Sequence, residues 1–121
     1  MTKHILIVDD SDFVRTAVRH FLEGQSGFDV CGEAVDGLDA LEKARFLMPD
    51  LIILDLTMPR MNGFQTAREL RAMKISAPII LFTVSAELIR PEQALAAGVT
   101  AVVAKEDLCR LQLHLDTLLT A

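Results

Sequence analysis

Residues 49–63, PDLIILDLTMPRMNG, contain the feature that decides the fold. Four consecutive apolar residues, 51–54, are followed at once by Asp55. A short, unbroken apolar run of this kind is typical of a strand that is buried on both faces of a parallel sheet. The stretch therefore predicts a buried strand whose carboxyl end presents an acidic side chain.

Four further runs are predicted to be strands as well. They cover residues 5–8, 28–34, 79–82 and 101–104, and the run at 28–34 is weaker and alternating. Helical spacing is found at residues 12–23, 37–48, 63–73 and 106–119, and in a segment that begins near Pro91 and stops at Gly98. Strands and helices in alternation predict an α/β fold, an open parallel sheet with helices on both faces. A barrel of eight such units would need about twice this length.

Apolar stripes predict which sides of two helices are buried. In the helix at 37–48, the residues spaced for burial are Leu38, Leu41 and Ala44. In the helix at 106–119, the predicted stripe consists of Leu108, Leu111, Leu115, Leu118 and Leu119. Leu113 lies roughly opposite this second stripe. A single exposed Leu is ordinary, and the sharper hypothesis is that Leu113 contacts a partner or a second copy.

Length and composition exclude several classes of protein. The 121 residues predict one domain over 1–121, with no output domain. A net charge of −5 disfavours direct contact with nucleic acid. The two Cys residues, without a CxxC motif or a Cys/His cluster, exclude a disulfide scaffold and a structural zinc site. No apolar run is long enough for a signal peptide or a membrane span, so we expect a cytoplasmic protein without membrane contact.

Polar residues follow four of the five predicted strands. They are Asp9 and Asp10 after the first strand, Asp55 after the third, Thr83 after the fourth and Lys105 after the fifth. The second run ends in Glu33 and Ala34 and shows no comparable signal. Because sites in open α/β sheets form at the carboxyl ends of the strands, we expect the polar residues to share one site.

Three carboxylates at one edge of a sheet need a counter-charge, because like charges held close together cannot all stay ionised. Lys105 supplies one positive charge, which is too little for three. We therefore expect a hard divalent cation, Mg²⁺ with Mn²⁺ as a substitute, held by Asp9, Asp10 and Asp55. The backbone carbonyl of Thr57 is a candidate for a further ligand. The His and Cys residues lie away from these strand ends, which argues against zinc or copper.

The same residue types suit phosphoryl chemistry. Asp55 stands apart from the acidic pair and is free to act as a nucleophile, since carboxylates form acyl phosphates in known enzymes. Lys105 and the hydroxyl of Thr83 can neutralise and bind phosphoryl oxygens. Taken singly, each residue has an ordinary explanation, because Asp and Ser cap helices and Asp is common in turns. Their joint occurrence on four strand ends is what favours a site.

At these residues the sequence resembles the receiver domain of two-component response regulators, over essentially the whole chain. The matching segments are ILIVDDS, GEAVDGLDALEKA, PDLIILDLTMPRMNGFQ, PIILFTVSA, AAGV and the final Lys105. Met58, Pro59 and Gly63 stand at the family's spacing after Asp55. The resemblance implies a flavodoxin-like (βα)5 fold, doubly wound, whose five parallel strands have the order 2-1-3-4-5.

The resemblance also implies roles for the site residues. Asp55 would accept a phosphoryl group from the phosphohistidine of a sensor histidine kinase or a histidine phosphotransfer protein. Asp9 and Asp10 would hold Mg²⁺, while Thr83 would be the switch hydroxyl and Lys105 would contact the phosphoryl group. Family members present the fourth helix, fifth strand and fifth helix to a downstream output protein or domain, or to a second copy in a homodimer. The domain would then be a phosphoacceptor and not an enzyme, and would at most catalyse its own phosphorylation and dephosphorylation.

Three positions depart from the family's pattern. Val102 stands where the family usually has Tyr or Phe, so coupling from the site to the surface must use other groups or is weakened. Glu106 follows the lysine where a Pro with a cis bond is common. Because a non-proline cis bond costs roughly 3 kcal/mol, we expect a trans bond, or a cis bond held by strong local packing. Val84 stands where a small residue is usual, and its bulk is expected to narrow access to Asp55 and to slow phosphorylation by small donors.

Four alternatives stay open. A degenerate receiver would act as a phosphorylation-independent binding module; Val84 and Val102 favour it, and the complete set of site residues argues against it. CGEAVDGLDALEKA is also reminiscent of receivers fused to helix-turn-helix domains, as in an N-terminal receiver fragment of a DNA-binding response regulator. A phosphohydrolase of the haloacid-dehalogenase type would have a second Asp where this chain has Thr57. A flavodoxin would have a loop rich in Gly, Ser and Thr where this chain has DDSDF.

Overall fold

The computed structural model of the protein describes residues 2–119 and contains one five-stranded parallel sheet. The strands are β1 (Lys3–Val8), β2 (Phe28–Ala34), β3 (Leu51–Leu54), β4 (Ile79–Thr83) and β5 (Ala101–Ala104). Their order is β2-β1-β3-β4-β5, and every neighbouring pair is parallel. The expected doubly wound, flavodoxin-like fold is therefore confirmed.

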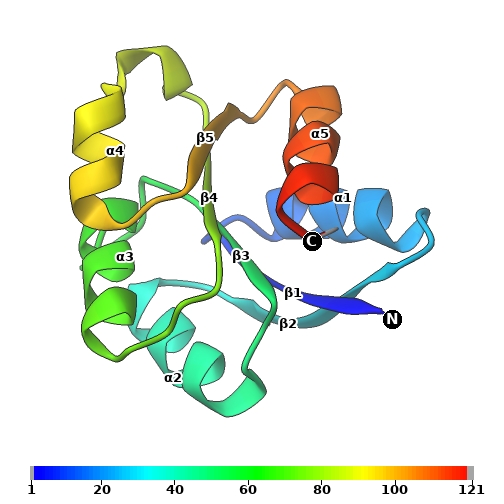
Figure 1. Ribbon diagram of the computed structural model, residues 1–121, viewed down its shortest axis with the longest axis horizontal. Coiled ribbons are helices and arrows are strands. Elements are labelled where there is room, and N and C mark those ends of the chain that lie inside the picture. The colour runs from blue at the N-terminus through cyan, green and yellow to red at the C-terminus, as the bar shows by residue number, and fades with distance from the viewer. Residues whose placement is uncertain (1, 120–121) are drawn as a thin grey trace.

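Helices cover both faces of this sheet (Figure 1). They are α1 (Asp12–Glu23), α2 (Gly37–Leu47), α3 (Gly63–Ala72), α4 (Pro91–Ala97) and α5 (Leu108–Leu119), with a short 3₁₀ turn at Ala86–Leu88. Helices α1 and α5 lie on one face, and α2, α3 and α4 lie on the other. No helix within residues 2–119 combines the length and the apolar composition that crossing a membrane requires.

The hydrophobic core has two layers, one on each face of the sheet. Leu51 and Ile53 of β3 pack in the layer that includes residues of α1 and α5. Ile52 and Leu54 alternate with them and pack in the layer that includes residues of α2, α3 and α4. All four side chains are buried, and each such burial contributes about 1.5–3 kcal/mol. Helices on both faces thus explain why β3 is an unbroken apolar run.

Helix α2 buries its small residues and exposes its large ones. The buried positions are Gly37, Ala40 and Ala44. Leu38 is 53% exposed and Leu41 is only partly buried, so the predicted burial is correct for Ala44 and wrong for Leu38. The cause is a close approach of α2 to α3, because a Cβ on Gly37 would lie 2.5 Å from Thr66 Oγ1. Such a distance leaves room for small residues alone on the inner side of α2.

Helix α5 begins at Leu108, two residues later than expected. Asp107 caps it, since its carboxylate accepts a hydrogen bond from the backbone N–H of Arg110 at 3.0 Å. The predicted stripe at Leu111 and Leu115 is buried. Leu108 is exposed, contrary to expectation, because helical side chains lean toward the N-terminus and a residue in the first turn leans past the end of the helix.

Strand β2 contains a bulge that the sequence pattern did not indicate. Its register with β1 shifts between Ile5 and Leu6, which leaves Cys31 as an extra residue. One extra residue reverses the alternation of side chains between the two faces. Val30, before the bulge, packs in the layer of α1 and α5, and Glu33, three residues later, points to the same side.

Gly63 brings the start of α3 against the loop that follows β3. Its backbone N–H donates to the carbonyl of Leu56 at 2.7 Å. A Cβ at this position would lie 2.5 Å from the carbonyl oxygen of Asp55 and 2.9 Å from Cα of Leu56. Only glycine allows this approach, which places α3 directly behind the backbone of Asp55.

We predict that Gly63→Ala lowers the free energy of unfolding by about 1–3 kcal/mol, because the added methyl group must displace backbone atoms. Gly24→Ala is the matched control, since a Cβ there meets its nearest atoms at 3.6 and 3.7 Å and should leave stability unchanged or slightly raised. Urea unfolding followed by circular dichroism measures both, as the chain has no Trp or Tyr. Equal stability of the two variants would contradict the argument.

Candidate functional site

Backbone hydrogen bonds hold the four polar strand ends at one edge of the sheet. The N–H of Asp9 donates to the last carbonyl of β2 at 3.1 Å, and that of Asp55 donates to the last carbonyl of β1 at 2.9 Å. On the other side, the N–H of Lys105 donates to the carbonyl of Thr83 at 3.0 Å. The sheet register itself therefore brings these residues to the same edge, as the sequence predicted.

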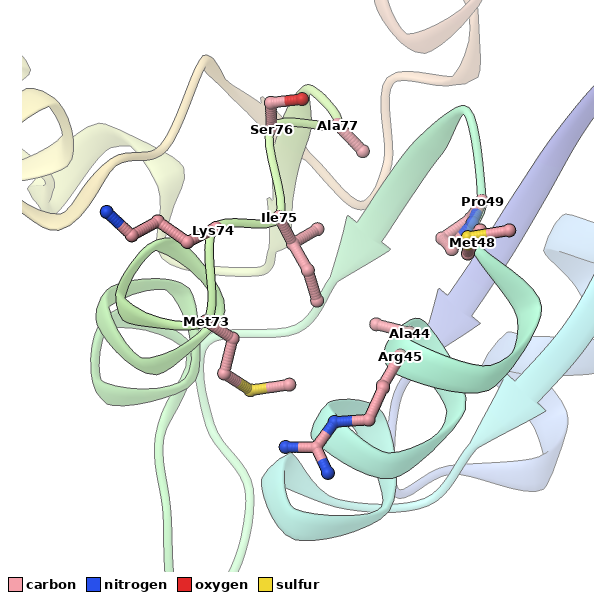
Figure 2. Close-up of a pocket in the computed structure, with 9 residues that line it drawn as sticks. All are labelled: Ala44, Arg45, Met48, Pro49, Met73, Lys74, Ile75, Ser76 and Ala77. Carbon is pink, nitrogen blue, oxygen red and sulfur yellow. The ribbon is translucent and has the colours of Figure 1, made fainter.

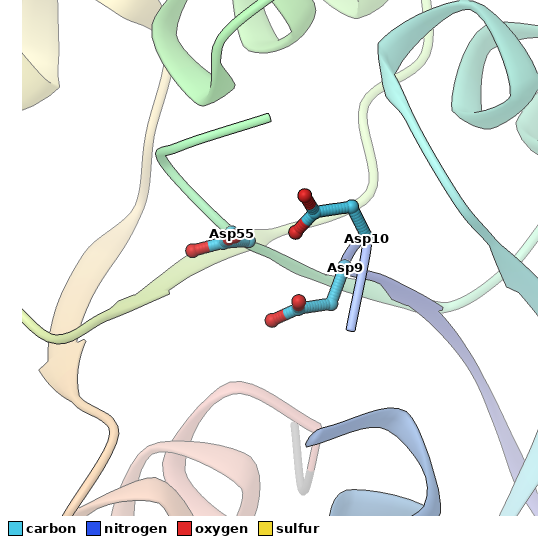
Figure 3. A group of neighbouring side chains, drawn as sticks. All are labelled: Asp9, Asp10 and Asp55. Atoms are coloured by element: carbon cyan, nitrogen blue, oxygen red, sulfur yellow. The ribbon is translucent and has the colours of Figure 1, made fainter. Parts of the chain in front are cut away.

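Three carboxylates gather there. Asp9 is 2% exposed and Asp55 is 5% exposed, while Asp10 is open to solvent. One oxygen from each residue lies within 4.8 Å of the others. Figure 3 shows Asp9 and Asp10 reaching from the loop after β1 toward Asp55, the residue that follows β3. Two of the three acidic groups are thus shielded from water, which makes their mutual repulsion strong.

Lys105 neutralises part of this charge. Its Nζ lies 2.7 Å from Oδ2 of Asp9 and 3.3 Å from Oδ1 of Asp55. The lysine side chain is 17% exposed, so both ion pairs are sheltered from solvent and screened less than surface pairs. The ammonium therefore sits between the two buried carboxylates.

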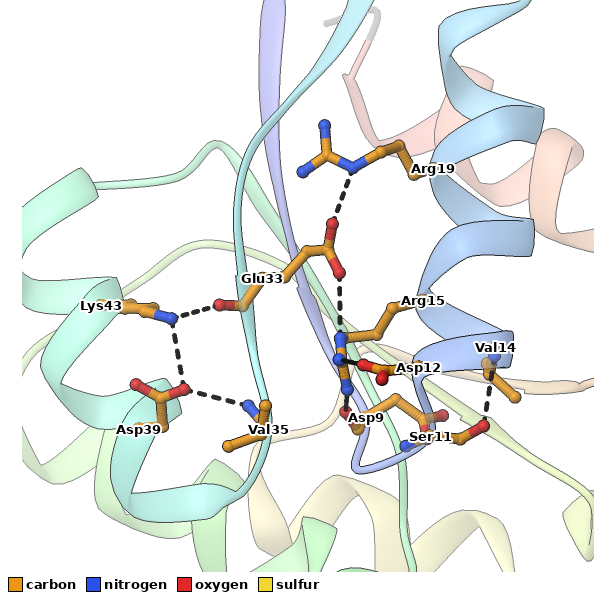
Figure 4. Close-up of polar contacts among 10 residues, drawn as sticks. All are labelled: Asp9, Ser11, Asp12, Val14, Arg15, Arg19, Glu33, Val35, Asp39 and Lys43. Carbon is orange, nitrogen blue, oxygen red and sulfur yellow. Dashed lines mark hydrogen bonds and ion pairs between the residues drawn. The ribbon is translucent and has the colours of Figure 1, made fainter.

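Asp9 is also fixed from its own side of the sheet. Its Oδ1 accepts a hydrogen bond from the backbone N–H of Ser11 at 2.9 Å. Its backbone carbonyl accepts one from Nη1 of Arg15 at 2.6 Å. Arg15 comes from the first turns of α1 and is 8% exposed. Both ends of Asp9 are thus held in place (Figure 4).

Arg15 belongs to a larger ion-pair network that includes Glu33. Nε of Arg15 donates to Oε1 of Glu33 at 2.9 Å, and Nε of Arg19 donates to Oε2 at 2.7 Å (Figure 4). Arg15 also pairs with Asp12. The second strand therefore contributes a polar group that supports the site through Arg15, although the sequence pattern showed no signal at its end. Burial raises the pKa of Glu33, but the hydrogen bonds from Arg19 and Arg15 outweigh it and hold the pKa below its ordinary value.

One feature of the sequence does indicate Arg15. It has the helical spacing of Val18 and Leu22, both of which are buried in the core. A charged residue within an apolar stripe needs a buried partner, because an unpaired charge in the core is costly. Which acidic group supplies that partner depends on the bulge in β2, and a pattern of residue types does not show the bulge.

The buried charges alter the proton affinities of the central pair. Burial and the neighbouring Asp9 raise the pKa of Asp55 above its ordinary value, and Lys105 and the backbone N–H of Thr57 offset this only in part. Burial lowers the pKa of Lys105, but the hydrogen bond and charge of Asp9 and the charge of Asp55 outweigh it, so the pKa is raised. Lys105 therefore stays protonated at neutral pH.

Thr83 is buried at the end of β4, and its hydroxyl faces Ser85. Its Oγ1 accepts a hydrogen bond from the backbone N–H of Ser85 at 3.3 Å and lies 3.3 Å from Oγ of the same residue. Both contacts are at the long end of the range for hydrogen bonds. The hydroxyl is thus placed at the edge of the sheet with weak local partners.

The three positions that depart from the family's pattern take different environments. Val84 is 71% exposed beside the site. Val102 is partly buried and lines a hollow of about 390 Å³ between α4 and β5. The peptide bond between Lys105 and Glu106 is trans, as predicted.

Leu113 is 61% exposed, in agreement with its place opposite the buried stripe of α5.

The chemistry of the donor set fits a hard divalent cation. The cluster of potential metal ligands found within residues 2–119 consists of carboxylates alone, from Asp9, Asp10 and Asp55. Mg²⁺ and Mn²⁺ prefer such oxygen ligands, whereas zinc and copper favour imidazole and thiolate. Lys105 already balances one negative charge, so a divalent cation would bring the site close to neutrality.

This fold and this acidic site define a phosphoacceptor signalling domain. Residues 5–116 match the family model described as the response regulator receiver domain, and the chain belongs to this family. Receiver domains accept phosphoryl groups in two-component signalling and bind Mg²⁺ at their acidic pocket. They are signalling domains without enzymatic activity of their own.

Similar proteins come from several kinds of response regulator. The chain is 34% identical over 105 residues to chemotaxis protein CheY of Thermotoga maritima, with 87% of each chain covered. It is 43% identical to the nitrate/nitrite response regulator NarL of Escherichia coli over 67% of this chain, which spans 38% of that relative's length. Its structure is similar to the response regulator domain of CheB from Thermotoga maritima, with a TM-score of 0.89, 26% identity and coverage of 100% and 98%.

We predict that Asp55→Asn raises the free energy of unfolding at pH 7, by on the order of 1 kcal/mol, in metal-free buffer. The raised pKa means that the folded state disfavours the ionised carboxylate. This cost is present at neutral pH and disappears as the pH falls below the ordinary range of an Asp carboxyl, where both states are protonated.

Urea unfolding at pH 7 and near pH 3.5 measures the change, and the stabilisation should shrink at the lower pH. Glu87→Gln serves as the control, because Glu87 is exposed and should leave stability unchanged at both values. A less stable Asp55→Asn variant at pH 7 would show that the Asp55–Lys105 pair outweighs burial.

Proposed function

We propose that this chain is the phosphoaccepting receiver of a two-component phosphorelay and that Asp55 is the acceptor. The observation that supports this most directly is the arrangement of charges at the strand ends. One buried carboxylate, Asp55, lies beside an acidic pair and 3.3 Å from the ammonium of Lys105. A nucleophile, a metal-binding pair and a fixed cation are the groups that phosphoryl transfer requires.

In the proposed reaction, a carboxylate oxygen of Asp55 attacks the phosphorus of a phosphohistidine. The donor is a sensor histidine kinase or a histidine phosphotransfer protein. An O–P bond forms at Asp55 while the N–P bond to the imidazole breaks, and the electron pair of that bond leaves with the histidine nitrogen. The products are an acyl phosphate on this chain and a free histidine on the donor.

Lys105 and Thr83 would bind the transferred group. The protonated Nζ of Lys105, now shared between Asp9 and Asp55, can turn to a phosphoryl oxygen without leaving Asp9 unpaired. The hydroxyl of Thr83 is engaged with Ser85 at 3.3 Å and can exchange this contact for a stronger, charge-assisted one. Movement of Thr83 would then report the chemical state of Asp55 to the rest of β4.

A divalent cation, Mg²⁺ or Mn²⁺, would be held by the carboxylates of Asp9, Asp10 and Asp55 and by the backbone carbonyl of Thr57. When bound, it would supply the remaining positive charge for the phosphoryl oxygens. The contacts of Ser11 and Arg15 to Asp9 support this proposal, because they hold this metal-binding residue in place before the cation binds.

Downstream, we propose that the face of α4, β5 and α5 controls an output protein or domain. Val102 lines the hollow behind this face where the family usually has an aromatic side chain, so weaker coupling is expected. This observation favours, as a second candidate, a module that binds its partner without phosphorylation. Relatives include a transcriptional regulatory protein, and for this chain we expect contact with DNA to come from an output unit and not from the acidic receiver.

The proposed acceptor is tested by intact mass after exposure to acetyl phosphate, with and without Mg²⁺. We expect one added phosphoryl group, dependent on Mg²⁺, and none on the Asp55→Asn variant. If acetyl phosphate does not react, the same assay with a phosphorylated histidine protein as donor decides. Phosphorylation of Asp55→Asn, or no addition from either donor, would contradict the assignment.

The bulk of Val84 gives a separate prediction. We expect Val84→Ala to take up phosphate from acetyl phosphate several-fold faster, because a smaller side chain beside Asp55 widens access for a small donor. The rate of mass increase measures the effect. Val35→Ala, at an exposed position after β2, is the control and should leave the rate unchanged. An unchanged rate in Val84→Ala would refute the steric account.

A further inference from the structure

Helix α2 presents large apolar side chains to solvent beside a groove that it forms with α3. Phe46 is 85% exposed, Met48 is 78% exposed and Leu38 is 53% exposed. Two hollows of about 460 and 710 Å³ share Arg45, Met48 and Met73, and together they make one groove. Figure 2 shows the residues that line the smaller hollow. Exposed apolar surface of this extent on one side of a small domain is a mark of an interaction site.

The groove lies away from the phosphoryl site. Pro49 and Ala77 line it and stand just before β3 and β4, so the groove is near the amino ends of these strands. Asp55 lies at the carboxyl ends. The packing of α2 explains the exposure, because its small residues face the core and its bulky ones have no place inside.

Charges are distributed unevenly along the groove. The hollow at the C-terminal ends of the two helices has Arg45 and Lys74 among its lining residues and no acidic residue. The adjoining hollow is lined by Glu42 and Glu69, and Arg45 lines both hollows. Within residues 2–119, none of these four side chains forms an ion pair or a hydrogen bond. The groove therefore has a basic end and an acidic end, both unpaired.

We propose that this groove is the interface of a homodimer with two-fold symmetry. A two-fold axis through the shared middle of the groove places the basic end of one copy against the acidic end of the other, twice. Phe46 of each copy enters the groove of its partner as the aromatic anchor. Met48 and Met73, which are flexible and polarisable, adapt to it at the centre.

Self-association suits this surface better than a partner of one charge sign. A purely acidic or purely basic segment would match one end of the groove and be repelled at the other. The same surface also offers both a protruding aromatic ring and the hollow to receive it. A second copy of the chain supplies both features in the required antiparallel arrangement. The proposal does not depend on phosphorylation of Asp55.

Sedimentation equilibrium over a concentration series up to about 1 mM tests for the dimer. We expect wild-type protein to form dimers and Phe46→Glu to raise the dissociation constant by roughly 30-fold or more, as for a central anchor. Phe13→Glu is the matched control, since it places the same charge at an exposed phenylalanine of α1, on the other face of the sheet, and should leave association unchanged. Circular dichroism verifies that each variant is folded.

Charge reversal then tests the two-fold arrangement. The double variants Glu42→Lys/Glu69→Lys and Arg45→Glu/Lys74→Glu should each be monomeric, because like charges meet at both ends. Their equimolar mixture should recover association, since each reversed end then meets its complement. A wild-type protein that stays monomeric, a dimer lost in Phe13→Glu but kept in Phe46→Glu, or a mixture that does not associate would overturn the proposal.

Discussion

The ion pair between Lys105 and Asp9 is the interaction on which the functional edge of the molecule depends. It spans the rim of the sheet, because Lys105 follows β5 at one side and Asp9 follows β1, with β3 and β4 between them. Without the ammonium, two buried carboxylates would face each other uncompensated. With it, Asp55 is left under-neutralised, as its raised pKa shows. The folded state is therefore less stable than it would be with a neutral residue at this position. The excess negative charge is what a bound cation, or a phosphoryl group together with its metal ion, would balance.

Much of the fold could be predicted from local patterns. The bounds of β2, β3, β5 and α1 agree with the sequence prediction, because apolar runs and helix caps are features of neighbouring residues. The gathering of Asp55, Thr83 and Lys105 could also be predicted, since parallel strands bring their carboxyl ends to one edge. The network of Arg15 and Glu33 could not be, because it depends on which face each side chain takes.

Packing distance accounts for the other differences. Leu38 points outward because α2 approaches α3 closely. The spacing of apolar residues in the sequence does not predict how close two helices come. The late start of α5 follows from a single cap at Asp107. In both cases the pattern of apolar residues was compatible with more than one helix orientation or starting point. A contact with another helix decided the first case, and a helix cap decided the second.

The bulge in β2 decides which face of the sheet each later side chain of the strand takes. Each side chain after Cys31 has exchanged faces relative to the residues before it, so Glu33 reaches α1 because the strand has one residue more than its partner. A homologous chain without Cys31 would form the same ladder with β1, and its glutamate, opposite Ile7, would still face α1. A strand of unchanged length that paired without the bulge would instead place its glutamate opposite Val8, turn it toward α2 and leave Arg15 without its carboxylate partner. The register of this strand against β1 is therefore under the same constraint as the identity of the residues that hold Asp9.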